Sequence, residues 1–175
     1  QELEREGWVE TTGAGPHLRR RLIKPEGLLD AWADDWVSRK ENRSRWHVLA
    51  RSNPVDTVLD KLQDYDGWAL TGAAAANAVV PHLTSVDRVQ VSVPPGHAEA
   101  WADQSQFKKV EKGANVVFIE REGASLMFLD THPERPGSRF ASRFIQYLDL
   151  LGGYGRDKEL AEEFRRDALH MKAKT

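Results

Sequence analysis

Residues 68–80, WALTGAAAANAVV, and residues 88–93, RVQVSV, decide the fold class of this chain. In the first stretch, residues 68–70 predict a short strand, and the alanine-rich residues 73–80 predict a helix. Between them, Thr71 and Gly72 indicate a turn. In the second stretch, three valines alternate with polar residues and therefore share one face of a strand. A strand, a helix and a further strand in this order indicate an α/β (α+β) protein, and we expect its sheet to be mixed.

Helical and strand patterns continue to alternate after residue 45. Asn53 is well suited to cap a helix that begins at Pro54, because its side chain can accept a hydrogen bond from a free backbone N–H. Residues 116–119 and 125–129 predict a β-hairpin. Two amphipathic helices are expected to close the chain. The first ends near Leu151, and the second begins at Asp157, whose side chain is expected to cap it.

The N-terminal part has a different pattern. Residues 8–11 and 18–23 predict a second hairpin, and Pro25 is placed to begin a helix, where its missing N–H costs nothing. Residues 38–45 are polar and predict a linker. We therefore expect two domains, residues 1–40 and residues 45–175.

The return strand of the N-terminal hairpin is strongly basic, with the sequence HLRRRLIK over residues 17–24. Alternate side chains of a strand share a face, so Arg19 and Arg21 point together and Arg20 points away. With Lys24, these arginines have two interpretations. They form the phosphate-gripping wing of a winged-helix domain, or they protect an edge strand against aggregation.

Composition excludes several classes of function. The chain has no cysteine, which rules out disulfides, thiol nucleophiles and cysteine-based zinc sites, and fits a cytoplasmic protein. Its histidines lack metal-binding spacing, so we expect neither a metal site nor a cofactor. No apolar run reaches the length of a membrane span. The net charge of −2 gives no whole-protein attraction to nucleic acid, so any DNA contact must be local.

One enzymatic alternative comes from Gly72 and Asp87. A strand, a glycine turn and a small-residue helix, followed by an acidic strand, is similar to polymerase-β-like nucleotidyltransferases. That chemistry needs two carboxylates on one face to hold metal ions at a triphosphate. Here Val89 stands where the second carboxylate is needed. We therefore expect a degenerate layout with no catalytic residues, and keep an enzyme using Gly72 and Asp87 as the alternative.

Residues 144–166, FIQYLDLLGGYGRDKELAEEFRR, resemble the closing signature of AbiEi-type antitoxins. These are transcriptional regulators of type IV toxin–antitoxin and phage-defence modules in bacteria. Residues 69–76 are also similar to that family, as are Gly7, Trp8 and Val9 followed by the helix at Pro25. The positions that carry the resemblance are Gly72, Gln146, Tyr147, Asp149, Leu150, Gly155 and Arg156.

The resemblance implies a remnant of a winged-helix domain followed by an antitoxin domain. It implies a non-catalytic protein that binds operator DNA, represses its own operon and opposes a toxin resembling a nucleotidyltransferase. The helix-turn-helix that the family places before Gly7 is absent from this sequence, so we expect this segment alone to bind DNA weakly. A plain protein-interaction domain is a further alternative.

Overall fold

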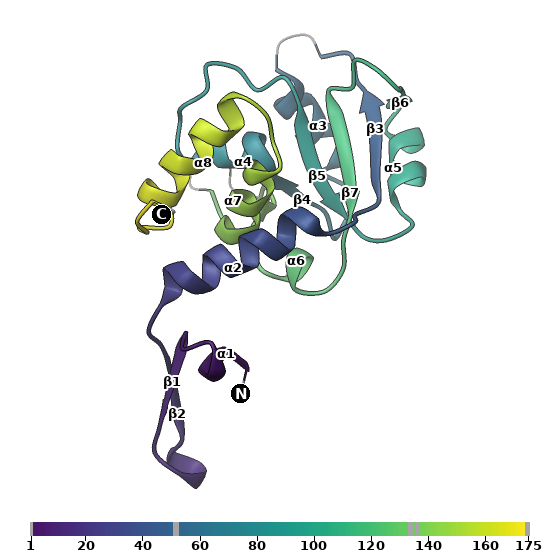
Figure 1. Cartoon of the computed structure of the whole chain (residues 1–175). Coiled ribbons are helices and arrows are strands. Elements are labelled where there is room, and N and C mark those ends of the chain that lie inside the picture. The colour runs from purple at the N-terminus through teal and green to yellow at the C-terminus, as the bar shows by residue number, and fades with distance from the viewer. Residues whose placement is uncertain (1, 51–52, 133–134, 136, 174–175) are drawn as a thin grey trace.

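The main body of the protein is a mixed seven-stranded sheet with the order β6-β3-β7-β5-β4-β9-β8 (Figure 1). The structure is a computed structural model that describes residues 2–50, 53–132, 135 and 137–173. Strands β5 and β7 are parallel, as are β4 and β9, and the other neighbours are antiparallel. The strands are β3 Arg43–His47, β4 Ala69–Thr71, β5 Val89–Val93, β6 Lys108–Lys109, β7 Val116–Glu120, β8 Leu129–Asp130 and β9 Phe140–Ala141.

Helices pack on both faces of this sheet. On one face, α3 and α5 bury a core that includes alternate residues of β5 and β7. On the other, α2, α7 and α8 form a second hydrophobic cluster over β4 and β9. The helices are α2 Pro25–Ser38, α3 Pro54–Leu62, α4 Gly72–Val79, α5 Ala98–Gln104, α6 Ala124–Met127, α7 Arg143–Leu151 and α8 Arg156–Asp167.

The strand–helix–strand pattern that was decisive in the sequence is confirmed by β4, α4 and β5. The fold class, the mixed sheet and the two closing helices are also as expected. Asn53 caps α3 as predicted, because its Oδ1 accepts a hydrogen bond from the backbone N–H of Val55 at 2.9 Å. Local patterns of hydrophobicity and capping therefore identify most elements of this chain.

The N-terminal residues form a separate hairpin that projects from the main body (Figure 1). It consists of β1 Val9–Thr12 and β2 Arg19–Leu22, preceded by the short helix α1 Glu2–Arg5 and joined by the 3-10 turn η1 Gly15–His17. This confirms the predicted N-terminal hairpin. Helix α2 begins at Pro25, as predicted, and connects the hairpin to the body.

The hairpin predicted for residues 116–119 and 125–129 is wrong. β7 lies between β3 and β5 in the sheet, so neither of its edges is free for a hairpin partner. The residues after Gly123 instead form α6, where the N–H groups of Leu126 and Met127 donate to the Gly123 carbonyl at 3.0 and 3.1 Å. Alanine, leucine and methionine favour helix intrinsically, which outweighs the weak strand pattern of this short run.

Two smaller expectations also fail. The stretch of residues 38–45 is not a free linker, because β3 begins at Arg43 and Glu41 pairs with the buried Arg121. Asp157 does not cap the last helix, because α8 begins one residue earlier and Gly155 occupies the N-cap with φ of 57°. The Asp157 carboxylate instead packs against Gly153, where an added Cβ would lie 2.4 Å from Oδ2.

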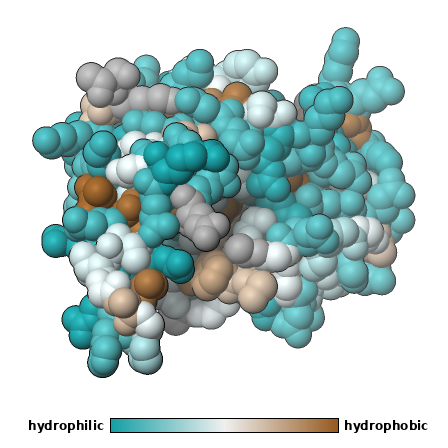
Figure 2. Space-filling model, turned by 60° about the horizontal axis from the view of Figure 1, so that its bottom comes forward, coloured by the Kyte–Doolittle hydropathy of each residue, from teal (hydrophilic) through white to brown (hydrophobic). Residues whose placement is uncertain are grey.

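The molecular surface is largely polar. Most of the face turned forward in Figure 2 is hydrophilic, and its hydrophobic residues lie in small separate groups. Within the described residues, exposed large apolar side chains on α2, α6 and α7 include Trp32, Val37, Met127 and Phe144. No helix in this part of the chain has the length and apolar character needed to cross a membrane.

Candidate nucleic-acid interface

The strand register of the N-terminal hairpin fixes which face each arginine occupies. Arg19 lies opposite Thr12, and Arg21 lies opposite Glu10. Directly opposed residues of an antiparallel pair share a face, so these four residues form one face of the hairpin. All four are exposed. We call this surface the arginine face.

The opposite face of the hairpin is occupied by α1. Here Thr11, paired with Arg20, is half-buried and donates a hydrogen bond to Glu4 of α1. This hydrogen bond, with a smaller contribution from Arg20, holds the pKa of Glu4 below its usual value. Arg20 therefore stands beside Glu4, whereas on the arginine face Arg21 lies opposite Glu10 and Arg19 lies opposite a threonine. Lys24 lies at the base of the hairpin, where its backbone N–H donates to the Trp8 carbonyl at 3.3 Å.

Helix α2 anchors the hairpin to the body of the protein. Its buried residues Leu29, Ala33 and Trp36 pack into the cluster formed by α7 and α8. Asp30 pairs with Arg165 of α8 at 2.5 Å, and the same Arg165 nitrogen donates to the Tyr147 hydroxyl at 3.0 Å. The signature residue Tyr147 thus helps hold α2 in place.

A buried polar network centred on Asp149 lies under the end of α2. The Asp149 side chain is 1% exposed and receives hydrogen bonds from three elements of the fold. Trp36 Nε1 of α2 donates at 3.1 Å, and the hydroxyl of Thr71 at the end of β4 also donates. Two nitrogens of Arg121 donate at 2.6 and 2.8 Å. A bidentate pair of this kind fixes the orientation of both groups.

Arg121 makes hydrogen bonds to several members of this network. Its side chain is 3% exposed, donates to Ser92 at 3.1 Å, and donates to the two carboxylate oxygens of Glu41 at 2.8 and 3.1 Å. Its guanidinium also lies 4.9 Å from the centre of the Trp36 ring. Burial alone would lower the pKa of Arg121, but Asp149 and then Glu41 raise it above its usual value. Arg121 therefore stays charged, and the network joins α2 to the sheet.

Glu41 makes the stability of this network pH-dependent. Burial opposes its ionisation, but Arg121 and then Arg43 outweigh burial, so the pKa of Glu41 lies below its ordinary value of 4.5. A carboxyl whose pKa is lower in the folded state stabilises the protein above its unfolded pKa, and this contribution is lost as the pH falls. We expect wild-type stability to fall below pH 4.5 more steeply than that of E41Q in urea titrations. Equal slopes for the two proteins would contradict this assignment.

The signature residue Gly72 is the first residue of α4 and has φ of +59°. A Cβ at this position would lie 1.8 Å from the side-chain oxygen of Gln90. Gly72 is thus covered by a side chain of β5 rather than open to a phosphate. Val89, where nucleotidyltransferase chemistry needs a second carboxylate, is fully buried in the core with α3 and α5. Asp87 is exposed and precedes β5.

Replacing Gly72 with alanine is expected to destabilise the protein by about 1–2 kcal/mol, because a left-handed backbone is unfavourable for residues with a Cβ. The clash with Gln90 adds little, since that side chain is flexible at its end. The companion variant G72A/Q90A should therefore recover only a small part of the loss. Thermal unfolding of both variants measures this, and full recovery in the double variant would show that crowding is the cause.

The other signature residues have different surroundings. Gln146 is fully buried and donates from Nε2 to the Ala141 carbonyl at 2.7 Å. Gly155 adopts a positive φ at the start of α8, and the exposed Arg156 donates to the His82 carbonyl at 3.4 Å. Within the described residues, no group of three or more histidine, aspartate or glutamate side chains is placed to hold a metal ion.

Sequence reasoning missed Arg121, Glu41 and the role of Trp36. Arg121 follows the apolar strand 116–120 directly, and a cation at the end of a buried strand was the only available signal. Glu41 lies in the stretch predicted to be a linker. Trp36 lies in the helix predicted to begin at Pro25, and no neighbouring residue indicates its hydrogen bond to Asp149.

The structure combines an α/β body that holds a buried polar network with a projecting basic hairpin. Residues 21–170 match the family described as transcriptional regulator, AbiEi antitoxin, of type IV toxin–antitoxin systems. Because the match covers most of the chain, the chain belongs to this family, and the resemblance found in the sequence is confirmed. No curated protein and no solved structure matches the chain. The match begins inside β2, so most of the hairpin lies outside it.

Proposed function

We propose that this regulator represses its own operon, with the arginine face of the hairpin contacting phosphates of operator DNA. The observation that supports this proposal best is the position of Arg19 and Arg21. They share one exposed face of a projecting hairpin, while α1 covers the other face. Phosphate contacts from such a wing position a regulator on the duplex, and base contacts from other elements specify the sequence.

We also propose that the body of the protein opposes a toxin resembling a nucleotidyltransferase, in the bacterial cytoplasm. Family membership as an antitoxin of a type IV system supports this proposal. We retain the division into a DNA-binding part, residues 1–40, and an antitoxin part, residues 45–175. In this division α2 packs on the antitoxin part, so the two parts share an anchoring helix.

Two readouts in cells test the proposal. The first is a reporter gene placed under the operon's own promoter, and the second is growth during expression of the neighbouring toxin gene from an independent promoter. The full-length wild-type protein should lower reporter output and restore growth. The variant R19A/R21A should lose repression but still restore growth, because the arginine face belongs to the DNA-binding part alone.

The adjacent arginine provides a matched control for this experiment. R20A removes the same charge from the opposite face of the same strand and should retain most repression. Failure of the wild-type protein to repress would overturn the DNA proposal. Failure to restore growth, with repression intact, would overturn the antitoxin proposal.

A further inference from the structure

One half of the sheet is uncovered on the face opposite α3 and α5. Strand pairing places Arg45 of β3, Val117 of β7 and Gln90 of β5 in a single row across this face. Ile119 and Ser92 form the next row of the sheet. Both are fully buried, so this row does not belong to the uncovered surface. The first row forms the floor of an open groove with a volume of about 1570 Å³.

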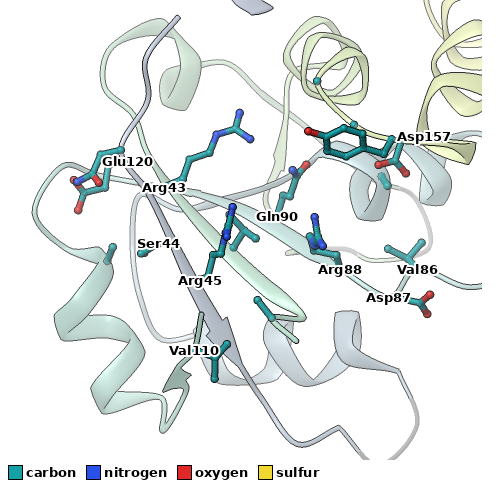
Figure 3. Close-up of a pocket in the computed structure, with 18 of the residues that line it drawn as sticks. Arg43, Ser44, Arg45, Val86, Asp87, Arg88, Gln90, Val110, Glu120 and Asp157 are labelled. Atoms are coloured by element: carbon teal, nitrogen blue, oxygen red, sulfur yellow. The ribbon is translucent and has the colours of Figure 1, made fainter. Parts of the chain in front are cut away.

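Two arginines, Arg45 and Arg88, lie on the floor of this groove. Neither of them makes a side-chain hydrogen bond or an ion pair within the described part of the chain, and both are exposed, but Arg88 lies close enough to Asp157 to offset part of the rise that burial causes in the pKa of that carboxyl. Arg43 differs, because Glu41 binds it at 2.7 Å. In Figure 3 the side chains of Arg45, Gln90 and Arg88 rise from the same face of the sheet. The groove floor therefore presents two exposed guanidinium groups beside one amide.

A glycine-rich loop forms one wall of the groove. Gly152, Gly153, Tyr154 and Arg156 line it, and Tyr154 is 85% exposed. An exposed aromatic ring beside a polar groove is a platform on which a nucleobase can stack. The three glycines around Tyr154 leave its ring accessible.

The acids that line the groove are mostly engaged. Glu99 pairs with Lys109, and Glu120 accepts hydrogen bonds from Asn42 at 2.7 Å and from the Gly96 backbone at 3.0 Å. Burial raises the pKa of Asp157, with partial compensation from the Tyr154 backbone and from Arg88. Asp87 and Glu111 complete the acidic lining. Of the two arginines on the groove floor, Arg88 lies near Asp157, whereas Arg45 makes no ion pair within the described residues.

We propose that this groove binds a nucleoside polyphosphate, with the phosphates at Arg45 and Arg88 and the base against Tyr154. Guanidinium groups match phosphate oxygens in charge and geometry. Gln90 offers a donor and an acceptor for a ribose hydroxyl or a base edge. Among the residues that the structure describes, no group of three or more histidine, aspartate or glutamate side chains is placed to hold a metal ion, and the proposed role is binding. This site goes beyond DNA repression and toxin opposition, and it uses none of the hairpin residues.

Isothermal titration calorimetry of the full-length protein with ATP and with GTP tests the proposal. At least one nucleotide should bind, and R45A/R88A should weaken its binding at least about tenfold, as expected for the loss of two charge-assisted contacts. Y154A should weaken binding about fivefold or more, as stacking contributes. R20A, on the hairpin, should leave binding unchanged, and circular dichroism should show that all variants are folded.

Two further probes distinguish the source of the phosphate chemistry. Pyrophosphate should bind more weakly than the nucleotide and should be insensitive to Y154A, because it has no base. A single-stranded RNA ten-mer should bind no more tightly than the nucleotide. Tighter binding of the ten-mer would assign the groove to nucleic acid instead. Absence of nucleotide binding at millimolar concentration, or full binding by R45A/R88A, would overturn the proposal while leaving repression by the hairpin untouched.

Discussion

Replacing Asp149 with alanine is expected to lower the free energy of unfolding by about 3–5 kcal/mol, the usual cost of breaking a buried ion pair. The variant leaves Arg121 buried, with Glu41 as its remaining charged partner. It also removes the acceptor for Trp36 and Thr71. Urea denaturation followed by tryptophan fluorescence and by circular dichroism measures the change.

A double-mutant cycle separates the ion pair from general damage to the core. R121M and D149L should each be strongly destabilising, whereas R121M/D149L should cost less than their sum, because no unpaired charge remains. D103A removes an exposed aspartate of α5 and should change stability by less than about 0.5 kcal/mol. Additive losses in the cycle would show that the two residues do not stabilise each other.

Reversing both charges of the arginine face, in R19E/R21E, is expected to reduce affinity for DNA by two orders of magnitude or more at low salt. Each lost phosphate contact removes counterion release, and each new carboxylate adds repulsion. In the milder variant R19A/R21A, the slope of log affinity against log salt should fall by about 2 in magnitude. Fluorescence anisotropy over a range of salt concentrations gives both values.

The loss should be nearly independent of DNA sequence, because phosphate contacts carry no direct sequence information. R20A is again the matched control and should change the slope by much less, since Arg20 lies on the face with α1 and beside Glu4. If R20A lowers affinity as much as R19A/R21A, the arginine face is not the contact surface.

The parts of the fold that were predicted correctly depend on neighbouring residues. The N-cap Asn53 and the alternating valines of β5 each show their structure within a few positions. The failed hairpin at residues 116–129 depended on something else. Whether β7 had a free edge was decided by β3 and β5, which come from distant parts of the sequence.

The candidate sites divide in the same way. The alternation of β2 sufficed to predict that Arg19 and Arg21 share a face, but not that α1 covers the other one. The importance of Asp149 was marked only by family resemblance. Its partners Arg121, Thr71 and Trp36 lie 28, 78 and 113 positions away, so no local pattern could reveal them. The groove at Arg45 could not be predicted from the sequence for the same reason. It exists only because helices cover one half of a sheet face and leave the other half uncovered.

Binding of the full-length wild-type protein to the DNA upstream of its own operon tests the central claim most directly. The measurement compares that DNA with a scrambled duplex of the same length, at low and at physiological salt. We expect the operon's DNA to bind at least about a thousandfold more tightly than the scrambled duplex, as specific regulators do. Equal affinity for both duplexes, or no binding even at low salt, would contradict the assignment of this protein as a repressor of its own operon.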